Sequence, residues 1–81
     1  MKFGQYFKTK RIQSGLTQKD ISDFLELGSI QMISNVERGI CYLSKKNLKS
    51  LCVKYKWDYE KFAKMIVEEK SDKLEKEWLG A

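Results

Sequence analysis

Apolar residues recur three or four positions apart along most of the chain, and polar or glycine-containing breaks separate them into five groups. This spacing places the apolar side chains of each group on one face of a helix. The predicted helices run from about 3 to 14, 18 to 25, 30 to 38 and 45 to 55, and a fifth begins after Asp58. The pattern therefore predicts an all-α fold, a compact five-helix bundle over residues 1–70 with a C-terminal helical extension over 71–81.

The same local signal marks the start of three of these helices. An apolar residue precedes a capping residue, and a second apolar residue follows four positions after the cap, as in a hydrophobic staple. The three occurrences are Leu16-Thr17 with Ile21, Leu43-Ser44 with Leu48, and Trp57-Asp58 with Phe62. Their repetition supports the predicted helix boundaries.

The stretch 17–39 has the pattern of a helix, a turn and a second helix. Thr17 and Asp20 have the spacing of a capping box at the first helix. The turn covers 26–29, where Gly28 suits a tight bend and Ser29 is a good cap for the second helix. Gly39 follows the second helix as its expected C′ residue. A helix-turn-helix unit is thus predicted in the first half of the chain.

The second helix of this unit has an inward apolar stripe and an outward polar face. Amide side chains at the surface of a short helix suit the edges of bases in a DNA groove, and an amide bonds adenine in a bidentate way. Gln31 and Asn35 are therefore the first candidates for base contacts, and Ser34 lies between base and backbone. Ile30 either meets a thymine methyl group or packs inward, and Arg38 is predicted to reach phosphate.

These residues resemble the helix-turn-helix of the phage Cro/repressor family, also called the XRE family. The resemblance covers roughly residues 5–66. This sequence departs from the family pattern in two places, because Ser22 replaces the usual alanine and the turn is one residue longer. The longer turn sets the register of the second helix only to within one residue. The resemblance implies a lambda-repressor-like domain in which Gln18 touches phosphate or braces a recognition residue. The matching residues are Arg11, Gly15, Leu16, Thr17, Gln18, Ile21, Leu25, Ile33, Ser34, Glu37 and Gly39.

Two charged residues lie on stripes that are otherwise apolar. Arg11 continues the row of Phe3 and Phe7, and Glu37 lies on the row of Ile30 and Ile33. A buried charge needs a partner. We therefore predict a structural ion pair between Arg11 and Glu37, and the resemblance implies the same pair.

Charge is unevenly distributed. Residues 1–56 hold eleven Lys/Arg and four Asp/Glu, a net +7, whereas residues 57–81 hold five and seven, a net −2. This segregation favours a polyanion as partner of the first half. Lysines at a helix start oppose the helix dipole unless a phosphate docks there. The predicted phosphate contacts are Lys45, Lys46, Lys49, Arg38, Thr17, Gln18 and Ser29.

The sequence gives little support for an enzyme. Histidine is absent, and neither a phosphate-binding glycine loop nor a nucleophile–base pair is visible. Cys41 and Cys52 are too few for a structural zinc site and suit reduced, partly buried thiols, so no cofactor or metal is expected. Signal-peptide and membrane-spanning patterns are absent as well. The expected location is the cytoplasm of a bacterium or phage host, on the nucleoid.

The tail, 71–81, carries three apolar residues at helical spacing, Leu74, Trp78 and Leu79. With Phe62 and Ile66 they are predicted to form or buttress a homodimer interface. The competing interpretation is that Trp78 folds back on its own subunit.

The predicted function is sequence-specific binding of double-stranded DNA by a transcriptional regulator that acts as a homodimer on a two-fold operator. A second hypothesis is a protein-interaction module, such as an antitoxin that binds a toxin through its tail and autoregulates its operon by binding DNA. The possible protein partner is then a toxin or another regulatory protein. A third is a degenerate helix-turn-helix that only dimerises.

Overall fold

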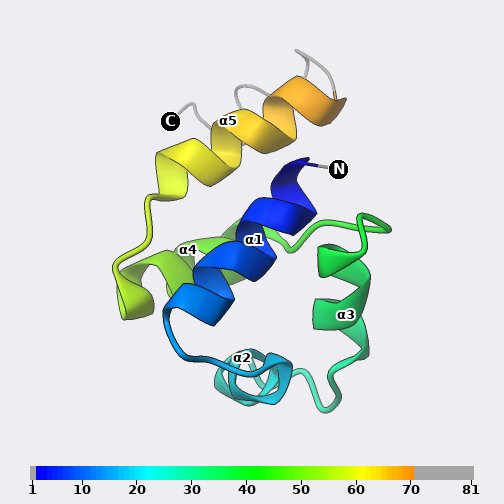
Figure 1. Cartoon of the computed structure of the whole chain (residues 1–81), viewed down its shortest axis with the longest axis vertical. Coiled ribbons are helices and arrows are strands. Elements are labelled where there is room, and N and C mark those ends of the chain that lie inside the picture. Colours follow the sequence, from blue (N-terminus) through cyan, green and yellow to red (C-terminus); the bar gives the residue numbers. More distant parts are fainter. Residues whose placement is uncertain (1, 71–81) are drawn as a thin grey trace.

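The computed structural model describes residues 2–70, which form five α-helices (Figure 1). They are α1 (Lys2–Gln13), α2 (Gln18–Phe24), α3 (Gln31–Glu37), α4 (Lys45–Tyr55) and α5 (Tyr59–Lys70). The predicted all-α five-helix fold is confirmed. α1 crosses the middle of the molecule, with α5 above it and the α2–α3 pair below and to the side.

An aromatic cluster at the α1–α5 contact forms the centre of the core. The Phe62 ring of α5 lies 5.6 Å from that of Phe3, 6.1 Å from Phe7 and 6.0 Å from Trp57, measured between centroids. Phe62 and Ile66 have no exposed surface. They are therefore core residues. Of the two predicted roles, to form or to buttress a homodimer interface, their burial fits the second, and the interface itself stays a prediction.

Three of the four predicted caps form the expected hydrogen bonds. Thr17 and Asp20 make a complete capping box on α2, with the Asp20 N–H donating to the Thr17 hydroxyl at 3.0 Å and the Thr17 N–H to the Asp20 carboxylate at 2.8 Å. These bonds lower the pKa of Asp20. Ser44 caps α4 through the Asn47 N–H, and Asp58 accepts from the Lys61 N–H before α5. Local side-chain chemistry thus sets these starts.

The carboxylate of Glu69 joins the two ends of the described chain. One oxygen accepts the backbone N–H of Phe3, at 2.7 Å, in the first turn of α1. The other accepts the hydroxyl of Tyr42, at 2.8 Å, from the segment between α3 and α4. Burial, and then this bond, raises the pKa of Tyr42 to about 12. An anion at the start of a helix offsets both its free N–H groups and its dipole. Glu69 is therefore a structural residue that ties α1 and the α3–α4 segment to α5.

α1 and α3 approach each other closely at Gly4. A Cβ atom at this position would lie 2.6 Å from the carbonyl oxygen of Val36 and 2.9 Å from that of Glu37. Both oxygens belong to backbone at the end of α3, which cannot move aside alone. Gly4 therefore sets the distance between α3 and α1.

A buried ion pair holds α3 against α1 and α2. Arg11 donates to both carboxylate oxygens of Glu37, from Nε at 2.6 Å and from a terminal nitrogen at 3.1 Å. The other terminal nitrogen donates to the Leu16 carbonyl at 2.7 Å, and the Gln18 amide donates to Glu37 at 3.1 Å. The two charged side chains are 10% and 4% exposed. The predicted Arg11–Glu37 pair is confirmed, and it links three helices.

Some predictions fall outside the described residues. Leu74, Trp78 and Leu79, and with them the helical extension over 71–81, lie there. Within 2–70, no helix combines the length and the apolar character that a membrane crossing requires.

The ion pair gives a test of the fold. Arg11→Met should leave the Glu37 carboxylate buried with only Gln18 as side-chain donor, and should lower the free energy of unfolding by about 3–5 kcal/mol. The double variant Arg11→Met with Glu37→Leu should recover much of the loss, because no unpaired charge remains. Urea unfolding measures all four members of the cycle. Losses that simply add in the double variant would contradict the pairing.

Candidate nucleic-acid interface

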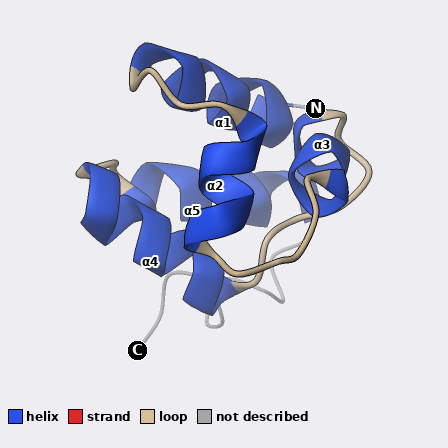
Figure 2. Ribbon diagram, turned by 90° about the horizontal axis from the view of Figure 1, so that it is seen from below, coloured by secondary structure: helices blue, strands red, loops and turns tan. Residues whose placement is uncertain are grey.

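α2, the turn and α3 form one continuous unit on the side of the molecule seen from below (Figure 2). The chain leaves α2 through Glu26, with φ of +56°, and reverses at Gly28, with φ of +82°. A Cβ at Gly28 would meet no atom within 4 Å, so the positive φ, and not lack of space, favours glycine there. The turn predicted at 26–29 is confirmed, and it directs α3 across the end of α2.

A hydrogen bond joins Ser22 of α2 to the end of the turn. The Ser22 side chain is buried, and its hydroxyl donates to the Ser29 carbonyl at the end of the turn, at 2.5 Å. An alanine at position 22 would leave this bond unmade. The hydroxyl therefore holds the turn against α2. This contact could not be predicted from Ser22 alone or from the turn alone.

α3 begins one residue later than predicted. Ile30 is the N-cap residue with φ of −81° and ψ of −3°, and it makes no side-chain capping bond. Ser29 accepts only a long bond, 3.4 Å, from the Gln31 N–H. The prediction of Ser29 as the helix cap is thus corrected: its carbonyl is held by Ser22, and Ile30 already has helical angles. The end of α3 agrees with prediction, since Gly39 follows with φ of +81°.

The outward face of α3 carries the predicted polar side chains. Gln31 is exposed, and its amide N–H donates to the side-chain oxygen of Asn35, one turn along, at 3.0 Å. Ser34 and Asn35 are half-buried, and Arg38 is exposed at the C-cap. Ile33 and Val36 face the core with no exposed surface. The structure therefore brings Gln31 and Asn35 together as a bonded amide pair at the surface.

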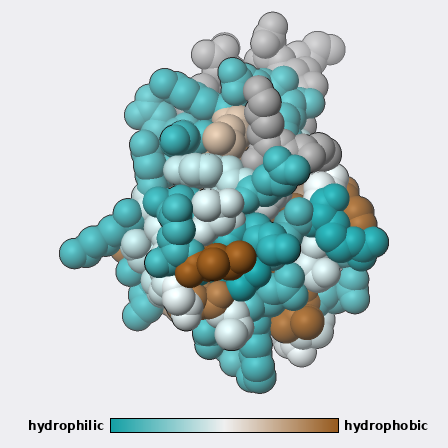
Figure 3. Space-filling model, viewed as in Figure 1, coloured by the Kyte–Doolittle hydropathy of each residue, from teal (hydrophilic) through white to brown (hydrophobic). Residues whose placement is uncertain are grey.

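Ile30 takes the outward of its two predicted placements. It is 47% exposed and is absent from the residues that pack on the core. Met32 is also exposed, and the Cys41 thiol donates to its sulfur at 3.6 Å. Met32 was not among the predicted surface residues of α3, because it lies between the inward apolar stripe and the outward polar face. Apolar patches on the face drawn in Figure 3 are small and separated by hydrophilic surface.

The structure gives structural partners to two residues predicted to contact phosphate. Thr17 uses its N–H and hydroxyl in the capping box. Gln18 donates to Glu37, so its amide braces the ion pair. The contact that the resemblance implies for Gln18, with phosphate or with a recognition residue, stays a prediction beside this observed partner. No local signal shows the contact with Glu37, because it depends on how α2 and α3 meet.

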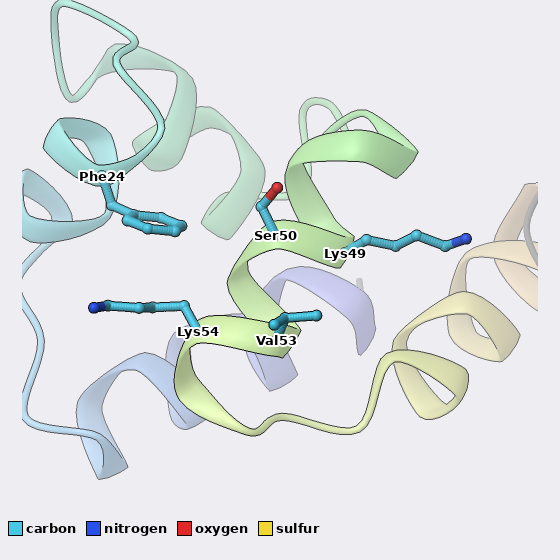
Figure 4. Close-up of a pocket in the computed structure, with 5 residues that line it drawn as sticks. All are labelled: Phe24, Lys49, Ser50, Val53 and Lys54. Atoms are coloured by element: carbon cyan, nitrogen blue, oxygen red, sulfur yellow. The ribbon is translucent and has the colours of Figure 1, made fainter.

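The predicted lysines at the start of α4 differ in their exposure and in their contacts. Lys46 is exposed and Lys45 is half-buried in the first turn. Lys49 extends toward α5, and its Nζ lies 5.3 Å from the centre of the Tyr59 ring (Figure 4). Lys46 and Lys49 are both exposed, and Lys46 is the one of the two that lies in the first turn of α4. Contact of these lysines with phosphate stays a prediction.

Among residues 2–70, no group of three or more acidic, histidine or cysteine side chains is arranged to hold a metal ion. The two thiols are separate, with Cys41 half-buried and Cys52 buried. Burial raises the pKa of Cys52 to about 11. The polar face of α3 is therefore the candidate site that the geometry presents.

Comparison of the chain with protein families, curated proteins and solved structures gives no significant match in any of the three.

Proposed function

We propose that this protein binds double-stranded DNA in a sequence-specific manner and regulates transcription, with α3 in the major groove. The observation that carries the proposal is the bonded amide pair of Gln31, which is exposed, and Asn35, which is half-buried, on a short helix whose opposite face is fixed to the core. A helix fits the major groove, where each base pair presents a distinct set of donors and acceptors. The helix-turn-helix resemblance supports the same role and suggests the Cro/repressor family.

The bonded amides have the donors and acceptors to recognise adenine. Their mutual bond uses one N–H of Gln31 and the oxygen of Asn35. The carbonyl oxygen of Gln31 and the amino group of Asn35 then present an acceptor beside a donor. Adenine offers the complementary N6 donor and N7 acceptor in the major groove. Because the bond also restricts the Gln31 side chain, less rotational freedom is lost on binding.

Phosphate contacts would hold α3 in the groove. Arg38 is exposed at the end of α3, and Lys46 lies in the first turn of α4, where free N–H groups and the dipole also favour an anion. The net charge of +7 over residues 1–56 supports a polyanion partner. We propose that these residues set affinity, and that Gln31 and Asn35 set sequence preference.

A homodimer is the second part of the proposal. One seven-residue helix reads few bases, whereas two copies about 34 Å apart enter successive major grooves on one side of the duplex. The operator would then have two-fold symmetry. Selection of bound duplexes from a random pool tests the whole proposal: it should enrich a symmetric sequence with adenine in each half-site. Enrichment of no sequence, at any salt concentration that permits binding, would contradict it.

Base recognition is tested by Gln31→Ala. The variant should lose about 1–3 kcal/mol of binding free energy on the selected operator and much less on a random duplex, because only the operator offers the matched adenine. Fluorescence anisotropy titration measures both. Ile12→Ala, at an exposed position of α1, is the control and should change neither affinity. Equal weakening on both duplexes would assign Gln31 to the DNA backbone.

Phosphate binding is tested by salt dependence. Lys46→Ala should flatten the slope of log affinity against log salt by about 0.9, the contribution of one phosphate contact. Operator and random duplexes should weaken alike. Lys64→Ala removes the same charge from α5, where Lys64 pairs with Glu60, and should leave the slope unchanged. The assignment fails if the two variants have the same slope.

A further inference from the structure

The outer face of α4 carries an open groove with an apolar floor (Figure 4). It consists of two adjoining hollows of about 450 and 310 Å³ that share Lys49 and Val53. We call this surface the α4 groove. Its lining residues are Phe24, Lys49, Ser50, Cys52, Val53, Lys54, Trp57 and Tyr59. The groove thus extends from the end of α2 to the start of α5.

Two apolar side chains that line the α4 groove are exposed to solvent. Val53 is 82% exposed, the highest value among the large apolar residues of the described chain, and Phe24 is 39% exposed. The Lys54 ammonium lies 5.9 Å from the centre of the Phe24 ring, and Lys49 lies over Tyr59. The two lysines therefore form a basic rim, and their stems extend the apolar floor. An apolar floor within a polar rim offers a small surface that one further apolar side chain could bury.

The segment that follows α5 has matching chemistry. Residues 71–81 contain Leu74, Trp78 and Leu79, and three acidic residues against two lysines. On α5 itself, Phe62 and Ile66 are already covered by the core, so they leave no exposed apolar row for the tail to continue. The acidic residues of the tail would face Lys49 and Lys54 on the rim of the groove.

The segment is also long enough to reach the groove. α5 begins at Tyr59, which lines the groove, and its twelve residues carry the chain about 18 Å away. Trp78 is the eighth residue after Lys70, and eight residues span at most about 29 Å when extended. The chain can therefore return along α5 if 71–81 is extended; as the helix predicted for this segment it would rise only about 12 Å over eight residues and fall short of the groove. A tethered segment also has a high effective concentration, which favours it over a second copy in dilute solution.

We propose that residues 71–81 fold back on their own chain and place the Trp78 ring in the α4 groove, over Val53. Trp78 would cover the side chains of Val53 and Phe24, which form the exposed floor of the groove. The adjacent acidic side chains would neutralise Lys49 and Lys54. This contact is independent of DNA binding by α3, and either proposal can hold without the other.

The test is a direct contact measurement on the full-length chain. Valine methyl groups are labelled with ¹³C, and nuclear Overhauser effects are recorded to indole protons. The chain has three valines, of which Val36 and Val67 are buried, so Val53 is readily distinguished. Cross-peaks from the Val53 methyl groups to the Trp78 ring should appear, persist on dilution and vanish in Trp78→Ala. Cross-peaks that remain in that variant arise from Trp57.

A second measurement uses variants that keep the core intact. Val53→Asp places a charge on the groove floor. The Trp78 contribution to fluorescence is the difference between the spectra recorded with Trp78 and with Trp78→Ala in the same background. With Val53→Asp this contribution should shift toward the emission of a solvated indole. Ile12→Asp is the matched control, because Ile12 is 57% exposed on α1 and away from the groove. It should cause no shift.

Two results would overturn the proposal. One is a full-length chain without cross-peaks between Val53 and Trp78. The other is a pair of differently labelled chains that show these cross-peaks only between molecules, which would assign the groove to the tail of a second copy.

Discussion

The position of the Glu37 carboxylate determines where α3 lies. α2 and α3 have seven residues each, and isolated helices of this length are not stable in water. Tertiary contacts must therefore hold α3, and Glu37 receives bonds from Arg11 of α1 and Gln18 of α2 at once. Gly4 allows α1 to lie against the backbone at the end of α3. The outward face of α3 can carry polar amides because the opposite face is fixed in this way.

Features that depend on neighbouring residues could be predicted from the sequence. The capping box at Thr17 and the cap at Ser44 use groups three positions apart, and α4 has the predicted bounds. The Arg11–Glu37 pair is a long-range contact, yet it was predictable because two charges on apolar stripes each need a partner. The outward polar face of α3 follows from helical periodicity. Periodicity did not decide whether Ile30 points outward or packs inward, because Ile30 lies at the margin of that face.

Features that depend on how distant segments meet could not be predicted. Glu69 has the sequence context of a solvated residue, and its role arises because the ends of α1 and α5 lie side by side. The Gln18 amide has its partner across the α2–α3 contact, and Ser22 has its partner at the end of the turn. Phe62 was predicted to form or buttress an interface, because periodicity shows that a residue faces inward and not which surface covers it.

We propose that α3 is the surface that meets DNA. Titration of the ¹⁵N-labelled chain with the selected operator duplex tests it most directly, because backbone amide shifts map the contact surface without mutation. The account predicts the largest shifts at Gln31, Asn35 and Arg38, with a second group in the first turn of α4 and little change along α5. Largest shifts on α5 or in the α4 groove, or no shifts with any duplex, would contradict it.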